Sequence, residues 1–217
     1  MPSSVPTTPK SIENYRPHVG DAVIDEIIAL AGPLKNARVL HVNATAFGGG
    51  VAEILNSAIP LLQNLGIDAD WQVIDASPEF FSVTKNMHNA MQGMYVPWNA
   101  AMGEIWSQTN HANASAMTGS YDFVYIHDPQ PAGVLHYLRQ NDPAVLGARW
   151  IWRCHLDTTE SLPEVWGFLH DYIQQYDAVI FTKAEYVKEA INGPLLDIIW
   201  PAIDPTSNKN TVIPQSV

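Results

Sequence analysis

The sequence predicts an α/β protein built on a doubly wound, Rossmann-like parallel sheet with helices on both faces. Short apolar strand-like stretches alternate with helix-like stretches along the chain, and near-continuous apolar strands are typical of parallel sheets buried on both sides. A hydrophobic fraction of 47% with only 15% charged residues indicates a folded protein. The 217 residues are enough for one domain with a substantial core.

Hydrophobic periodicity assigns the helices. Apolar residues recur at helical spacing, and a glycine follows each of the first two helical segments as a stop signal. The less regular stretch 79–111 predicts two helices interrupted near Pro97. The other helices are expected at residues 21–31, 51–65, 132–140, 162–176 and 184–192.

Shorter apolar runs between these helices predict the strands of the sheet. Their lengths suit strands rather than helices. The six strands are expected at residues 37–43, 70–75, 121–127, 149–155, 177–182 and 196–200.

Composition divides the chain into three parts. Residues 1–20 are expected to form a mobile N-terminal tail, because residues 1–9 are rich in Ser, Thr and Pro. Residues 21–200 form the predicted Rossmann-like domain. Residues 201–217 turn polar and irregular, which is typical of a linker or tail.

The charge balance excludes several kinds of partner. A net charge of −11 disfavours binding to nucleic-acid phosphates or to anionic membranes. No stretch approaches the roughly 18 continuous apolar residues of a membrane span. The single Cys154 excludes an intramolecular disulfide and suits a cytoplasmic location. A metal site is not expected, because the histidines and carboxylates lack metal-ligand spacing.

Three consecutive glycines, Gly48, Gly49 and Gly50, lie between the first predicted strand and the second predicted helix. Glycines allow a sharp turn and leave bare N–H groups at the helix N-terminus, which favours an anionic or polyhydroxyl ligand. The pattern fits neither GxGxxG nor GxxxxGK[ST]. Close packing of strand against helix is an equally good explanation of the glycines taken alone.

Polar residues gather where the predicted strands end. Asn43 and the glycine loop follow the first strand, residues 127–130 (His-Asp-Pro-Gln) follow the third, and residues 153–157 (Arg-Cys-His-Leu-Asp) follow the fourth. In open parallel sheets, ligands bind at the carboxyl ends of the strands. The three clusters together therefore predict a ligand site at this edge.

Each polar residue also has a purely structural interpretation. His127 could satisfy buried backbone groups, and capping of the following helix is the favoured role of Asp128. Arg153 and Asp157 could pair at the surface without measurable effect. His155 is the most suggestive residue, because an acid two residues later could orient its ring for hydrogen bonding or proton transfer.

Two further sets of polar residues are ambiguous. His41 lies within the first strand and is expected to be a core or sheet-face residue. Lys85, His88, Asn89 and Gln92 share one helical face. That face is either solvated or lines an acceptor pocket.

Taken in order, these motifs resemble those of the trehalose-forming retaining glycosyltransferases, within the glycogen-synthase-like family 4 class. The resemblance covers about residues 39–210, and its specificity lies in the combination of motifs. The matching motifs are HVN at 41–43, GGGVAE at 48–53, KNMHN at 85–89, HDPQP at 127–131, WRCHLD at 152–157 and IDP at 203–205.

The resemblance implies one half of a GT-B fold, in which two Rossmann-like domains face each other across a cleft. The N-terminal domain would hold the acceptor, glucose, and the C-terminal domain would hold a nucleoside diphosphate glucose as donor, with no further cofactor. The implied roles are catalytic for His155, donor binding for Gly48, Gly49, Gly50 and Arg153, and acceptor binding for Lys85, His88, Asn89, Gln92, His127, Asp128 and Asp157.

The sequence departs from the family pattern where the second domain is expected, just past Asp204. The basic pair that neutralises the diphosphate would belong to that domain, and stabilising a leaving group of this kind is normally the largest catalytic term. We therefore expect little or no transferase activity from this chain alone. A chain carrying the C-terminal domain is a possible partner, as is a second copy meeting the exposed cleft face.

Two other functions remain as alternatives. One is a stand-alone sugar- or nucleotide-binding module, or a subunit encoded by a split gene, without catalysis. The other is an NAD-binding domain, which we set aside because the GxGxxG pattern and its acidic residue about 20 positions later are missing.

Overall fold

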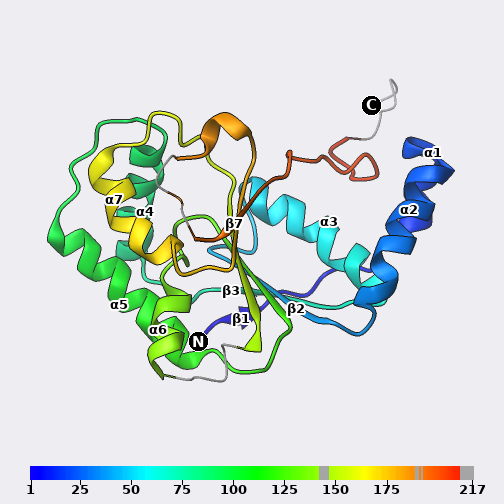
Figure 1. Ribbon diagram of the computed structural model, residues 1–217, viewed down its shortest axis with the longest axis horizontal. Helices are drawn as coiled ribbons and strands as arrows, with labels where there is room; N and C mark the ends of the chain where they lie inside the picture. The colour runs from blue at the N-terminus through cyan, green and yellow to red at the C-terminus, as the bar shows by residue number, and fades with distance from the viewer. Residues whose placement is uncertain (142–146, 189–190, 192, 211–217) are drawn as a thin grey trace, which may run out of the picture.

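A seven-stranded sheet runs through the computed structural model, which describes residues 1–141, 147–188, 191 and 193–210 (Figure 1). The strand order is β1-β3-β2-β4-β5-β6-β7, and every neighbouring pair is parallel except β1 with β3. The predicted α/β fold class is confirmed. The strands are β1 (Ser3–Ser4), β2 (Arg38–Asn43), β3 (Asp68–Val73), β4 (Phe123–His127), β5 (Arg149–Cys154), β6 (Ala178–Phe181) and β7 (Leu195–Ile198).

The helices follow the predicted periodicity closely. The bounds of α2 coincide with the prediction, and the two helices expected within 79–111 are α4 and α5, separated by the segment around Pro97. The α-helices are α1 (Arg16–Val19), α2 (Asp21–Ala31), α3 (Gly50–Asn64), α4 (Pro78–Met91), α5 (Ala100–Ala116), α6 (Val134–Asn141) and α7 (Pro163–Ile173).

The connection order creates a switch point between β2 and β4. From β2 the chain passes through α3 to β3 on one side, and then returns through α4 and α5 to β4 on the other side. The loops that leave β2 and β4 therefore diverge at the carboxyl ends of these strands. Open parallel sheets bind ligands in the crevice that such a divergence leaves.

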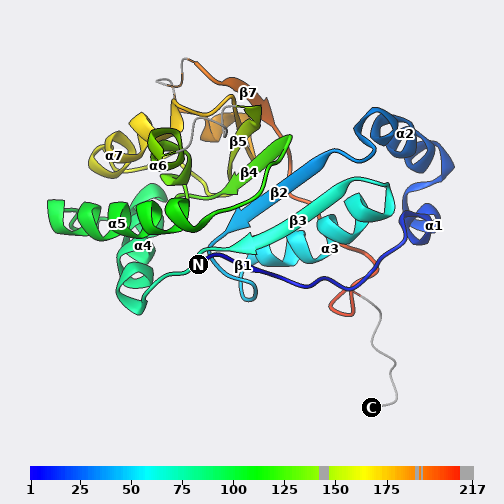
Figure 2. The same ribbon diagram turned by 90° about the horizontal axis from the view of Figure 1, so that it is seen from below.

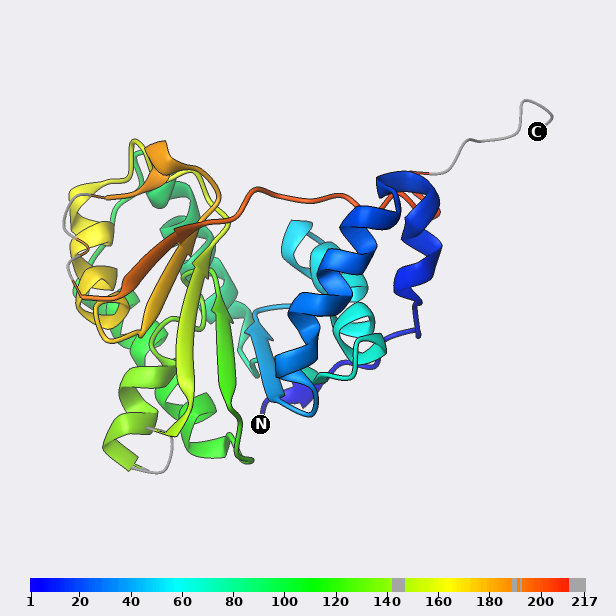
Figure 3. The same cartoon turned by 45° about the vertical axis from the view of Figure 1, so that its right-hand side comes forward.

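The helices cover the two faces of the sheet unequally. In Figure 3 the sheet is seen almost edge-on, with α4 to α7 on one side and α3 with α1 and α2 on the other. Figure 2 shows α3 running along β2 and β3. Among the described residues, β5 to β7 carry no helix on the α3 side in these views, and the segment after β7 crosses that face.

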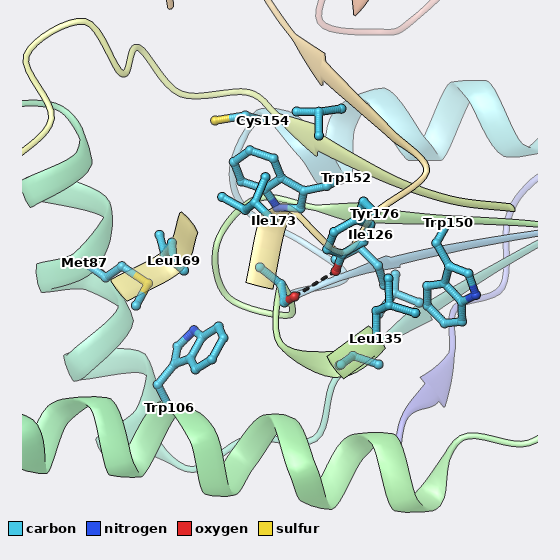
Figure 4. Close-up of a cluster of buried hydrophobic side chains, with 14 of the residues drawn as sticks. Met87, Trp106, Ile126, Leu135, Trp150, Trp152, Cys154, Leu169, Ile173 and Tyr176 are labelled. Carbon is cyan, nitrogen blue, oxygen red and sulfur yellow. Dashed lines mark hydrogen bonds between the residues drawn. The ribbon is translucent and has the colours of Figure 1, made fainter. Parts of the chain in front are cut away.

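The larger core lies under α4 to α7 and is unusually aromatic. Trp106 and Trp152 are fully buried there, as is Phe181, which meets the Trp152 ring edge-on with centroids 6.0 Å apart. The Tyr176 hydroxyl donates a hydrogen bond to the Ala132 carbonyl at 2.8 Å, so this polar atom is satisfied within the core (Figure 4). The seven tryptophans thus serve packing to a large extent.

A smaller core joins α3 to β2 and β3. Leu55 and Ile59 of α3 pack with Val39 and Trp71 of the sheet. These contacts fix the direction in which α3 leaves the glycine loop, so they also position the loop.

The N-terminal segment, expected as a mobile tail, carries regular elements. β1 pairs antiparallel with β3, and the Val5 N–H donates to the Trp71 carbonyl at 2.8 Å. The 3-10 helix η1 (Ile12–Tyr15) and α1 follow. An edge strand is held by hydrogen bonds of its backbone, which depend little on the identity of its side chains. The Ser/Thr/Pro-rich composition therefore gave no sign of this strand.

One other element differs from its prediction. The helix expected at 184–192 is the 3-10 turn η4 (Ala184–Tyr186), and residues 189–190 and 192 lie outside the described part. The apolar face of α2 is incompletely covered, since Val23 and Ile28 are each 42% exposed. The segment after β7 returns to α3, where the Asp204 carboxylate accepts from Lys10 and from Ser57.

No described helix has the length and apolarity needed to cross a membrane.

Gly133 is where packing requires a glycine, because a Cβ there would lie 2.5 Å from the Trp106 ring. We expect Gly133→Ala to lower the free energy of unfolding by about 1–3 kcal/mol through overpacking. Gly167, exposed within α7 and without neighbours around an added Cβ, provides the control. Gly167→Ala should raise the free energy by about 0.5–1 kcal/mol through helix propensity. Urea denaturation of both variants measures these changes in the free energy of unfolding. Equal changes for Gly133→Ala and Gly167→Ala would contradict the prediction.

Candidate functional site

A pocket of about 220 Å³ opens at the carboxyl ends of β2 and β4. It coincides with the switch point of the sheet, where a ligand site is expected. Its wall comes from the end of β2, the glycine loop, the start of α3, one residue of α4 and the residues after β4. The polar side chains of the wall are Asn43, Thr45, His88, His127, Asp128 and Gln130.

The glycine loop has a conformation that other residues adopt with difficulty. Gly48 and Gly49 have φ angles of 73° and 92°, which lie in the region that favours glycine. An added Cβ on Gly48, Gly49 or Gly50 would meet nothing within 4 Å. Close packing within this chain therefore does not account for the three glycines, and the backbone conformation accounts for two of them.

The loop presents unpaired backbone donors at the start of α3. Gly49 is the N-cap residue, and no side chain in the described part of the chain caps the helix. The first N–H groups of a helix have no acceptor within the helix, and the helix dipole adds partial positive charge there. The pocket wall includes this end of α3, so an anionic or polyhydroxyl ligand could accept from these groups.

Asn43 holds the entry to the loop in place. This residue is buried, its Nδ2 donates to the Thr45 carbonyl at 2.8 Å, and its Oδ1 accepts from the Trp71 Nε1 at 2.7 Å. One side chain thus joins the end of β2 to the loop and to β3. Its role is to fix the backbone that leads into the glycines.

Three histidines from neighbouring strands form a hydrogen-bonded chain. His41 Nδ1 lies 2.9 Å from His127 Nε2, and His127 Nδ1 lies 3.0 Å from His155 Nε2. Adjacent rings are stacked, with centroids 5.2 and 5.3 Å apart. The chain runs from the interior of β2 through the end of β4 to the residue that follows β5.

The surroundings keep all three rings neutral near pH 7. Burial lowers the pKa of His41 to about 3 and that of His155 to about 4, and the charge of Arg153 adds to both effects. Burial also lowers the pKa of His127 well below its ordinary value, with the neighbouring histidines contributing. Each ring therefore carries one proton and can donate once and accept once.

Asp128 ties the ends of β4 and β5 together. Its Oδ1 accepts from the His155 backbone N–H at 2.8 Å, and its own N–H donates to the Arg153 carbonyl at 2.9 Å. Asp128 adopts a φ of 62°, which turns the backbone sharply. The expected role as a cap of the next helix is wrong, because the carboxylate is engaged by the neighbouring strand instead.

Burial also changes the acidity of Asp128. It raises the pKa of the carboxyl to about 7, while the hydrogen bond from His155 and the positive charge of Arg153 act in the opposite direction. A carboxyl with such a pKa can be protonated or ionised near neutral pH. It lies in the pocket wall beside His127.

The structure brings together only part of the residues predicted for the site. The three glycines, His127 and Asp128 line the pocket, as does His88 of α4, and His155 adjoins it through His127. Arg153 pairs in register with His127. The remaining predicted residues are outside the pocket wall: Lys85, Asn89, Gln92 and Asp157.

Two expectations about the loop after β5 are wrong. Asp157 does not orient the His155 ring, because its carboxylate accepts from the Thr159 backbone N–H at 3.0 Å and hydroxyl at 2.6 Å. The His155 ring is held by His127 instead. Within the described residues Asp157 also forms no ion pair with Arg153.

His41 was expected to be a core or sheet-face residue, and it is indeed buried, but its link to His127 was missed. The signal that could have revealed this link is that both residues lie in predicted strands whose carboxyl ends share one edge of the sheet. The register of β2 against β4 was needed to use that signal.

A family described as trehalose synthase, N-terminal domain, matches residues 41–188. The chain belongs to this family. The matched residues contain the whole histidine chain and all polar side chains of the pocket wall.

Similar proteins of known name agree with the family. A trehalose synthase of Thermococcus litoralis is 42% identical over 209 residues, which cover 95% of this chain and 49% of the relative. A trehalose synthase of Rubrobacter xylanophilus is 41% identical over 94% of this chain and 49% of its own length. A trehalose phosphorylase of Pleurotus pulmonarius is 30% identical over 89% of this chain and 29% of its own length. The chain spans about half the length of the trehalose synthases it matches.

Solved structures share the fold at low sequence identity. A trehalose-6-phosphate synthase has a TM-score of 0.60 at 14% identity and covers 78% of this chain and 50% of its own. An α,α-trehalose 6-phosphate synthase from Burkholderia multivorans has a TM-score of 0.51 at 12% identity, covering 75% and 49%. These neighbours are GT-B glycosyltransferases, which agrees with the architecture implied by the sequence motifs.

The raised pKa of Asp128 predicts a pH-dependent contribution to stability. The folded carboxyl has a pKa of about 7 and its ordinary value is 3.8, so between these pH values the folded state binds the proton more tightly. The contribution of this group is therefore fully present below pH 4 and is lost as the pH rises to 7. Asp128→Asn should gain stability relative to the parent between pH 4 and 7, and the difference should stay level above pH 7.

Unfolding free energies from urea denaturation across this pH range measure the effect. Asp157→Asn is the matched control, because the hydrogen bonds from Thr159 lower the pKa of Asp157. Its stability difference from the parent should be flat from pH 4 to 7. A flat difference for Asp128→Asn as well would contradict the prediction.

Proposed function

We propose that this chain is the acceptor-side domain of a retaining glucosyltransferase that forms trehalose, or a related α-glucoside, from a nucleoside diphosphate glucose and glucose. The observation that carries the proposal is the pocket at the β2–β4 switch point, where the glycine loop meets His127 and Asp128 in a chain of the trehalose synthase family. The relatives named trehalose synthase support the choice of product.

The glycine loop suits the donor side of the proposed reaction. A departing nucleoside diphosphate carries concentrated negative charge, and fixed donors aimed at such charge lower the barrier without reorganising. The N–H groups at the start of α3 are donors of this kind. The half-buried Arg153 guanidinium lies close enough to lower the pKa of both His155 and Asp128, so it adds positive charge at this end of the sheet.

The histidines suit the acceptor side. A neutral imidazole can donate to one sugar hydroxyl and accept from another. Among the described residues, no Lys or Arg side chain lines the pocket. Asp128, with its pKa of about 7, adds a carboxyl that can accept a proton. In this proposal the chain orients glucose, and positioning contributes much of the rate enhancement.

A second domain would complete the site. The glycine loop and Arg153 offer limited charge for a diphosphate, and the curated relatives are about twice as long as this chain. We propose that a C-terminal domain, on the same or another chain, grips the nucleotide. A binding module without catalysis remains the second candidate, because the residues described here form the pocket and the loop by themselves.

The first test is made on the chain as it stands. We expect calorimetry to detect weak glucose binding, and we expect no trehalose at enzyme-like turnover with nucleoside diphosphate glucose and glucose. If this chain is the acceptor-side domain, adding the C-terminal half of a trehalose synthase as a separate chain should produce turnover. Binding that never leads to turnover in any combination would favour the module, and absence of sugar binding would contradict both.

Gly49→Val tests the loop. The substitution places a β-branched residue at a φ of 92°, at a strain cost of about 1–3 kcal/mol, and it fills space beside the donors of α3. We expect nucleotide-sugar binding to be lost in the two-domain enzyme. Gly20→Val is the matched control, since Gly20 has a φ of 87°, open surroundings and an N-cap position on α2. Equal binding of the nucleotide-sugar by both variants would show that the glycine loop is a backbone turn without a role in binding.

A further inference from the structure

The histidine chain has two different ends. At the inner end, His41 Nε2 is buried and has no hydrogen-bond partner in the described part of the chain. At the outer end, His155 Nε2 is bound to His127, whereas His155 Nδ1 has no partner among the described residues and is not fully buried. The outer nitrogen therefore reaches solvent or a ligand, whereas the inner one reaches neither.

Two proton arrangements satisfy both hydrogen bonds of the chain. Each neutral ring carries one proton, and each contact of 2.9 or 3.0 Å needs one donor and one acceptor. In the first arrangement all three rings carry the proton on Nδ1. In the second all three carry it on Nε2. A ring that differed from the other two would set two protons or two lone pairs against each other.

The inner end distinguishes these arrangements. With the protons on Nε2, His41 would bury an N–H group with no acceptor, and orphaned buried N–H groups are rare in folded proteins. With the protons on Nδ1, His41 buries an unpaired acceptor instead, which is better tolerated. The outer nitrogen of His155 meets solvent in both arrangements, so it adds no comparable difference.

We propose that His41 and His127 are positioning residues that fix the tautomer of His155, so that His155 presents a proton on Nδ1 at the accessible end of the histidine chain. The buried ring of His41 then sets the hydrogen-bonding polarity of a side chain two rings away. A sugar hydroxyl that meets this nitrogen accepts a hydrogen bond from it. The use of that donor for a sugar rests on the proposed function, whereas the tautomer does not.

The tautomer is measured directly by long-range proton–nitrogen NMR on the folded chain with ¹⁵N-labelled histidines at pH 7, without any sugar. The loss of one set of ring signals in His155→Gln assigns His155. We expect the Nδ1 of His155 to show the shift of a protonated ring nitrogen and its Nε2 that of an unprotonated one. The opposite pattern would overturn the proposal.

His41→Met tests the control exerted by the inner ring. A thioether can only accept, so His127 should turn its Nε2 proton toward the sulfur, and His155 should then carry its proton mainly on Nε2. His41→Gln keeps an amide donor toward His127 and should retain the parent tautomer. His18→Met, on the exposed surface of α1, is the matched control.

Unchanged His155 signals in a folded His41→Met protein would overturn the coupling, as would identical shifts in His18→Met. If His41→Met fails to fold, the measurement on the parent chain and on His41→Gln still decides the tautomer. Calorimetry with glucose reports separately on the proposed function, because a confirmed tautomer without sugar binding would remove only that function.

Discussion

The parallel pairing of β2, β4 and β5 is the constraint on which the site depends. Parallel strands align their carboxyl ends, and equal register places paired residues on the same face of the sheet. His41 pairs with Tyr125, and His127 pairs with Arg153, so the histidines and the arginine share the face that α3 partly covers. A shift of one residue in either pairing would turn these side chains to the other face and break the chain of hydrogen bonds. The strand register of the sheet therefore sets the distances between the histidine rings.

Burial supplies the chemistry that this geometry uses. Two aromatic and aliphatic cores hold the strands in place, and the polar residues of the pocket lie at the carboxyl ends of β2 and β4. At these positions desolvation keeps the histidines neutral and raises the pKa of Asp128 to about 7. Neutral donors and acceptors suit a sugar, which offers hydroxyl groups and no charge. The bare N–H groups at the start of α3 supply a feature of the wall that suits an anion.

Several site residues could be predicted from the sequence because local features mark them. The glycines lie at a strand–helix junction. His127, Asp128 and His155 lie at the ends of apolar runs whose lengths suit strands rather than helices. Lys85, Asn89 and Gln92 were grouped with His88 by helical spacing alone. Spacing shows which residues share a face of α4 but not which of them the neighbouring elements leave facing the pocket. The role of Asp128 was misjudged for a related reason, since its partner is the N–H of His155, which directly follows β5 and is far from Asp128 in the sequence.

The sequence by itself determined the α/β class, most element bounds and the family motifs, because periodicity, glycine positions and short motifs are local properties of the chain. Only the tertiary structure decided that β1 closes one edge of the sheet and that His41, His127 and His155 form a single chain. It also decided that Asp157 binds Thr159 rather than orienting the ring of His155. These outcomes depend on strand order, register and burial, which arise from contacts between residues far apart in the sequence. No local pattern records such contacts, so the pocket could be located from the sequence while its proton-bearing atoms could not.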